Sequence, residues 1–202
     1  MKKLAFICLF IMSILSLSAC SNLSDTKMGI GPYPLNERDQ SLLESFALLD
    51  QSQLLSFNAP KEATSLMIHL YSLDESGNWQ DVQSGGGISI ETERDANTHL
   101  EGTFAMTLND DHSINFVISS HGRFSSRVDL DDLGFDSAIS THSFLTDFQT
   151  IELNKEIPVA IMVFDNGTSM RSFSVDSYFE PDIFEGMNSV QAVTLTFTNK
   201  EL

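Results

Sequence analysis

The stretch LEGTFAMTLNDDHSINFVISSHGRFSSRVDL, residues 100–130, decides the fold class. Apolar and polar residues alternate through it in three segments, which is the period of a strand with one buried and one wet face. The apolar positions are Phe104, Met106 and Leu108, then Ile114, Phe116 and Ile118, and finally Phe124, Val128 and Leu130. Because the polar turn 109–112 separates the first two segments, we expect consecutive antiparallel strands.

The same period recurs on both sides of this stretch, at Leu66, Ile68 and Leu70, at Val159, Ile161 and Val163, and at Val193, Leu195 and Phe197. Along the whole chain the pattern predicts about nine or ten strands, separated by turn signals. The strand–helix alternation of a parallel sheet is absent from the sequence. We therefore predict a mainly β protein, a single antiparallel β-sandwich of jelly-roll or immunoglobulin-like type with one short N-terminal helix.

Four local features complete the predicted fold. A helical spacing of apolar residues runs over 36–55, and we expect that face to cover one end or face of the sheets. Gly85–Gly87 reads as a flexible connection between strands, and 165–167 as a tight hairpin into a strand at 170–175. Residues 177–186 are expected to form a helical turn or loop.

The first twenty residues have the parts of a secretory signal. A short positive segment ending at Lys3 precedes an apolar run of about 12 residues, too short for the roughly 20 that span a bilayer. Small residues follow, ending in Leu17-Ser18-Ala19-Cys20.

This ending resembles the lipobox of bacterial lipoproteins, and the resemblance covers only residues 1–20. It implies that residues 1–19 are removed, that Cys20 carries the acyl chains (a palmitate-type anchor), and that the protein stays lipid-anchored outside the cytoplasm, in the cell membrane or outer membrane. Ser21 after the cysteine favours the outer membrane in that family. We expect residues 20–36 to be a flexible tether, because Gly29, Gly31, Pro32 and Pro34 interrupt regular structure, and residues 37–202 to be the folded domain.

Charge excludes one class of partner. The chain has 11 Lys and Arg against 28 Asp and Glu, a formal charge of −17, so it lacks the basic surface that nucleic acid requires. Removing Lys2 and Lys3 with the signal makes the side-chain charge −19. Such a surface is repelled by anionic lipid heads, so the acyl chains alone would hold the protein at the membrane.

Two side-chain groups are candidate ligand sites. Trp79 and Tyr71 are expected on the two strands of one hairpin, where they form either a small platform for a glycan or a cross-strand packing pair. Asp129, Asp131 and Asp132 offer hard oxygen ligands for Ca²⁺, but position 12 of an EF-hand loop starting at Asp129 is serine. We expect no other cofactor.

The chain contains none of the common hydrolase, nucleotide or zinc-protease motifs. We therefore expect a cell-surface binding or interaction module rather than an enzyme, with a glycan or another envelope protein as its partner. The alternative is an envelope-associated hydrolase of glycan or peptide with an unrecognised carboxylate site.

Overall fold

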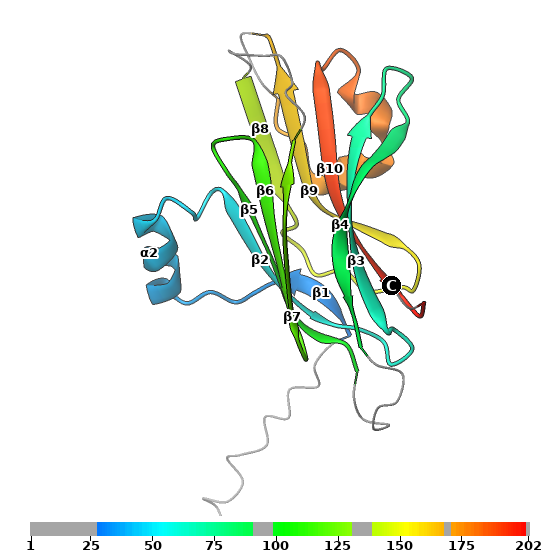
Figure 1. Cartoon of the computed structure of the whole chain (residues 1–202). Coiled ribbons are helices and arrows are strands. Elements are labelled where there is room, and N and C mark those ends of the chain that lie inside the picture. Colours follow the sequence, from blue (N-terminus) through cyan, green and yellow to red (C-terminus); the bar gives the residue numbers. More distant parts are fainter. Residues whose placement is uncertain (1–27, 91–98, 131–138, 168–170, 201–202) are drawn as a thin grey trace, which may run out of the picture.

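The computed structural model describes residues 28–90, 99–130, 139–167 and 171–200. Within these ranges ten strands form two five-stranded antiparallel sheets that pack face to face, with the short helix α2 (Glu37–Ser45) near the N-terminus (Figure 1). The predicted antiparallel β-sandwich with one short helix is thereby confirmed.

The first sheet has the strand order β1-β2-β5-β6-β7. Its strands are β1 (Gly29–Pro32), β2 (Ser52–Asn58), β5 (Glu101–Leu108), β6 (Ser113–Ser119) and β7 (Arg123–Asp129). The second sheet has the order β4-β3-β10-β9-β8. Its strands are β3 (Ser65–Leu73), β4 (Trp79–Ser89), β8 (Ile139–Phe144), β9 (Glu156–Asp165) and β10 (Ser189–Thr198).

The core lies between the sheets and contains most of the residues whose alternation predicted the strands, whereas Ile161 and Val163 of β9 lie on the outer face of the second sheet. Phe104 and Phe116 of the first sheet and Phe197 of the second are fully buried. The rings of Phe57 and Phe197 meet edge to face across the interface, with centroids 5.5 Å apart. Period-two patterning therefore places one apolar face of each sheet against the other.

One side of the sandwich is closed by the two edge strands β4 and β7, which lie against each other. Gly85–Gly87, expected to be a flexible connection, instead lies inside β4, where Gly86 and Gly87 pair with β3. Gly86 has a φ of +87°, and a Cβ there would come within 2.3 Å of Cζ of Phe124 on β7. The glycines allow this close approach, so their role is packing rather than flexibility.

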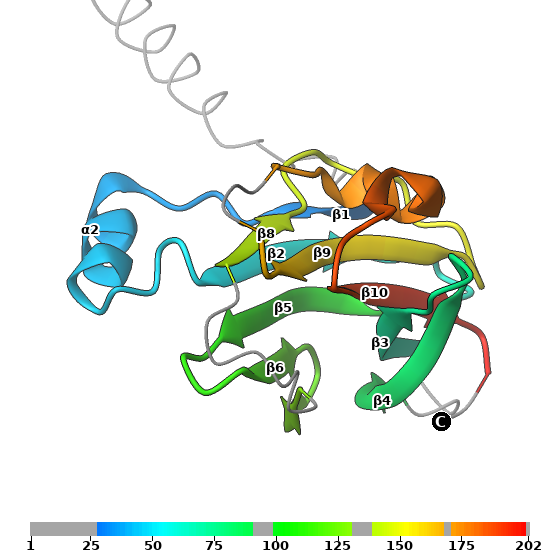
Figure 2. The same ribbon diagram turned by 90° about the horizontal axis from the view of Figure 1, so that it is seen from above.

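The outer face of the second sheet is covered by two short 3₁₀ helices, η1 (Val175–Phe179) and η2 (Pro181–Phe184). Figure 2 shows them next to β9, which η1 contacts. The helical turn expected at 177–186 is confirmed, but the strand expected at 170–175 is wrong, since 171–174 are irregular and η1 begins at Val175. Because the helices cover this face, Ile161 and Val163 are buried on it.

The helix is shorter than predicted and covers neither end nor face of the sandwich. It ends at Ser45, and the apolar residues expected to continue it, Leu54 and Leu55, belong to β2 between β1 and β5. No residue of α2 is buried, and Leu42 is 58% exposed. The strand forms because Leu55 and its neighbours also fit a period of two, and pairing on both sides satisfies their backbone.

The segment expected to be a tether enters the fold before residue 37. Residues 29–32 form β1, paired with β2, and Ile30 is fully buried. A Cβ at Gly29 would lie 2.1 Å from Cζ of Phe148, so this glycine lets the Phe148 ring lie across the strand instead of interrupting it. No helix in the described ranges is long and apolar enough to span a bilayer.

Candidate functional site

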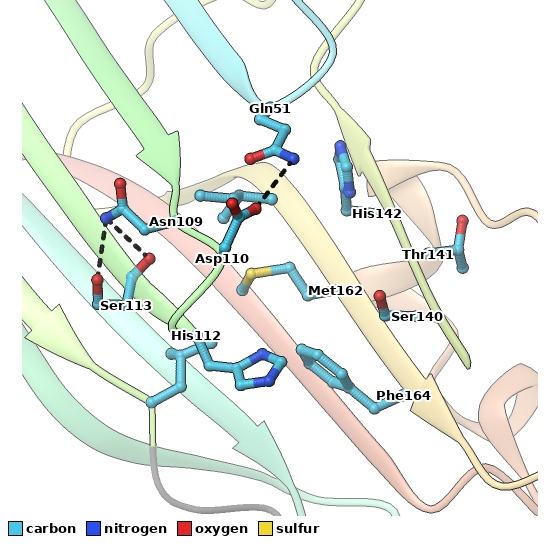
Figure 3. Close-up of a pocket in the computed structure, with 12 residues that line it drawn as sticks. Gln51, Asn109, Asp110, His112, Ser113, Ser140, Thr141, His142, Met162 and Phe164 are labelled. Atoms are coloured by element: carbon cyan, nitrogen blue, oxygen red, sulfur yellow. Dashed lines mark hydrogen bonds between the residues drawn. The ribbon is translucent and has the colours of Figure 1, made fainter. Parts of the chain in front are cut away.

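A cavity of about 260 Å³ opens at one end of the sandwich, between the two sheets (Figure 3). From the first sheet it is lined by Gln51, by Leu108 at the end of β5, and by the β5–β6 turn. From the second sheet it is lined by β8 and β9. The lining residues are Gln51, Leu108, Asn109, Asp110, His112, Ser113, Leu130, Ser140, Thr141, His142, Met162 and Phe164.

The floor of the cavity is apolar and fixed by strand pairing. Met162 and Phe164 lie two apart on β9, and both are buried. The register pairs them with His142 and Ser140 of β8, so the floor and one polar rim come from neighbouring strands. An apolar floor with a few polar groups at the rim is the usual composition of a small-molecule site.

The β5–β6 turn forms the opposite rim and is held by its own side chains. Asn109 donates from Nδ2 to Oγ of Ser113 at 2.9 Å, and the Ser113 hydroxyl donates to Asp111 Oδ1 at 2.6 Å. His112 completes the turn with a φ of +58°, a conformation that only a few per cent of non-glycine residues adopt. Its imidazole lies edge to face with the Phe164 ring, with centroids 6.1 Å apart.

The two carboxylates of this turn have different surroundings. Asp111 accepts from Ser113 and from the Arg127 guanidinium at 2.6 Å, and these two partners lower the pKa of Asp111 to about 2. The Asp110 carboxylate instead lines the cavity, where Oδ1 lies 3.5 Å from the Gln51 amide nitrogen. Asp111 is thus neutralised by an ion pair, whereas Asp110 presents its charge to the cavity.

Polar groups also bridge the sheets on this side. His142 donates from Nε2 to the main-chain carbonyl of Asp50 at 2.6 Å, and Gln53 donates from Nε2 to the Leu145 carbonyl at 2.7 Å. These two bonds join β2 and the loop before it to β8 and the residue after it. They hold the wall of the cavity without filling its interior.

The structure brings Trp79 and Tyr71 together, but as part of a packed cluster. The Trp79 ring stacks on Tyr178 of η1, with centroids 5.0 Å apart, and its indole N–H donates to the Tyr178 carbonyl at 2.9 Å. Tyr71 lies 6.0 Å from Tyr178. At least one face of the indole is therefore occupied by Tyr178, a residue outside the hairpin.

The same cluster contains a carboxylate held by two phenols. Tyr71 and Tyr178 both donate to Glu156, the Tyr178 bond measuring 2.5 Å. Burial and the nearby Glu156 raise the pKa of both tyrosines well above the ordinary value of 10. Glu156 at the start of β9 thereby fixes η1 to the sheet.

Asp129, the described member of the expected calcium site, forms an ion pair with Arg127 at 3.1 Å. Asp131, Asp132 and Cys20 lie outside the described residues. Among the described residues, no group of three or more His, Cys, Asp and Glu is arranged to hold a metal ion.

No sequence pattern indicates the cavity. His112 and His142 are thirty positions apart in the sequence, and both line the cavity only because β8 pairs with β9 and the two sheets pack together. Comparison of the chain with family models, with curated proteins and with solved structures found no match.

Proposed function

We propose that this protein is a bacterial lipoprotein, anchored outside the cytoplasm through Cys20, whose β-sandwich binds a small ligand without transforming it. The cavity between the β5–β6 turn and β8 carries the second part of the proposal, because it combines an apolar floor with polar groups at the rim. The lipobox Leu17–Cys20 supports the anchor.

The bonding of the polar groups favours binding over catalysis. The Ser113 hydroxyl donates to Asp111 and not to an imidazole, and His142 donates to a main-chain carbonyl. Nucleophilic catalysis needs a hydroxyl activated by an adjacent base, in hydrogen-bond reach of it. Both groups are instead engaged in holding the cavity walls.

The anchor is tested by metabolic labelling with a fatty-acid analogue. The wild type should be labelled and found in the membrane fraction, whereas Cys20→Ser should be unlabelled and released. Labelling that persists in Cys20→Ser would contradict the lipoprotein assignment.

The ligand site is tested by a fragment screen using ligand-observed NMR. Ser140→Phe places a ring at the cavity mouth and should abolish binding of every fragment that competes for the cavity. Ser125→Phe, on the exposed side of β7, is the matched control and should bind as the wild type does. Fragments that bind Ser140→Phe and wild type equally would show that the cavity is not the site.

A further inference from the structure

We infer that the cavity selects a small organic cation with an apolar body, whose ammonium group lies at Asp110. This inference rests on the proposed function, since it names the ligand class of the same cavity. Three features of the cavity support it: the charge of its lining, its apolar floor and its size.

The charged lining is one-sided. Asp110 is the carboxylate among the described lining residues, and no lysine or arginine lines the cavity with it. The guanidinium bound to the β5–β6 turn, that of Arg127, is held by Asp111 at 2.6 Å and by Asp129 at 3.1 Å. An ammonium group would therefore meet an uncompensated negative charge, whereas a carboxylate or phosphate would meet repulsion.

The net charge of the chain also favours a cationic ligand, and it does so over longer distances. A chain with a formal charge of −17 attracts cations and raises their local concentration at its surface. Because Asp110 is exposed at the rim, its contribution should weaken as salt is added.

The floor favours an apolar, preferably aromatic, body on that cation. Met162 and Phe164 are buried beneath the rim, and Leu108 and Leu130 line the same space. Aromatic rings and thioethers both make favourable contacts with aromatic ligands. The Phe164 ring also has the negative π-face that attracts ammonium groups.

The size of the cavity limits the ligand. Its volume of about 260 Å³ is slightly smaller than the ~300–1,000 Å³ of sites for drug-sized molecules. A single ring with a short amine chain fits this description, whereas a glycan of several sugars does not.

Three probes that differ mainly in charge test the inference: 2-phenylethylamine, 2-phenylethanol and 3-phenylpropionate. Their dissociation constants are measured by titration of the folded domain at pH 8, in low and in high salt. We expect the amine to bind about ten-fold more tightly than the alcohol, the acid to bind weakest, and the advantage of the amine to shrink in high salt.

Variants assign the effect to one carboxylate. Asp110→Asn should weaken amine binding about ten-fold and leave alcohol binding unchanged. Asp182→Asn removes an exposed carboxylate on η2, away from the cavity, and should change neither. If Asp110→Asn fails to fold, Asp110→Ser and the salt dependence of the wild type give the same comparison.

The outcomes separate the two proposals. Equal or tighter binding of the alcohol or the acid overturns the cation inference and leaves a small-ligand site standing. Amine binding that Asp110→Asn does not weaken also overturns the inference. If none of the three probes binds and the fragment screen finds no ligand, the proposed small-ligand function itself fails.

Discussion

Replacing Gly86 by alanine should destabilise the sandwich through the contact that closes its β4–β7 side. The new Cβ would lie 2.3 Å from Cζ of Phe124 and would sit on a backbone with a φ of +87°. Overpacking of this kind costs about 1–3 kcal/mol, and a positive φ costs an L-residue about 1–2 kcal/mol. A smaller entropy gain of about 0.4–1 kcal/mol from the unfolded chain offsets part of the sum.

We therefore expect Gly86→Ala to lower the free energy of unfolding by about 2–4 kcal/mol. For a domain of this size the melting temperature should fall by roughly 5–15 °C. Thermal and urea unfolding followed by circular dichroism measure both quantities.

Alanine substitutions at two other glycines distinguish the cost of the Phe124 contact from the cost of backbone strain. Gly186 has a φ of +88° with nothing within 4 Å of its Cβ position, so Gly186→Ala should cost only the strain, about 1 kcal/mol. A Cβ at Gly122 would meet only Ile88 Cδ1 at 3.9 Å, so Gly122→Ala should be neutral or slightly stabilising. Equal losses in Gly86→Ala and Gly186→Ala would refute the close approach of Phe124 and with it our account of the closure.

Other predictions concern the remaining parts of the fold. The folded state keeps Tyr71 and Tyr178 protonated above the unfolded pKa near 10, so the free energy of unfolding should fall as the pH rises above 10. The fall should be at most about 1.4 kcal/mol per pH unit for each tyrosine, and less after screening by solvent. Urea titrations at pH 9 and pH 11 should show a smaller fall in Tyr178→Phe than in the wild type. Asn36→Ala removes the side chain that accepts from the N–H groups of Arg38 and Asp39, so α2 should lose about 0.5–2 kcal/mol of local stability. Hydrogen exchange should detect that loss without a change in melting temperature, since α2 buries no residue. Phe197→Ala should cost about 3–5 kcal/mol in urea unfolding, because its ring is fully buried between the sheets; a loss below 1 kcal/mol would contradict that placement.

Alternation of apolar residues was enough to predict the architecture because each sheet has one face in the core. It predicted β9 as a strand but did not reveal that a second layer buries Ile161 and Val163 on the outer face of that strand. In β9 the sequence Ile157–Phe164 is almost continuously apolar, and both faces are buried because η1 and η2 cover the outside. A continuous apolar run of this length is typical of a strand that is buried on both faces.

The roles of two glycines were also predicted wrongly, because the role of a glycine depends on the residues that pack against it. The sequence shows that Gly29 and Gly86 can adopt many conformations, which favours a tether at one position and a loop at the other. In the structure these glycines serve packing, because the Phe148 ring at Gly29 and the Phe124 ring at Gly86 each need space that only a glycine leaves. Such partners lie far away along the chain, so no local pattern can reveal them.

The position of the candidate site follows from the different closure of the two sides of the sandwich. On the β4–β7 side, an aromatic ring packs directly on backbone at Gly86 and fills the space. On the opposite side, the Phe148 ring packs on Gly29 and main-chain hydrogen bonds join Ile30 to Gln149, but beside the cavity the sheets are joined by hydrogen bonds from His142 and Gln53 to main-chain carbonyls. Hydrogen bonds hold strands at a set distance without occupying the volume between them, so the end of the sandwich beside these bonds retains a cavity. The imidazole of His112, held in a rare backbone conformation beside Phe164, completes its rim.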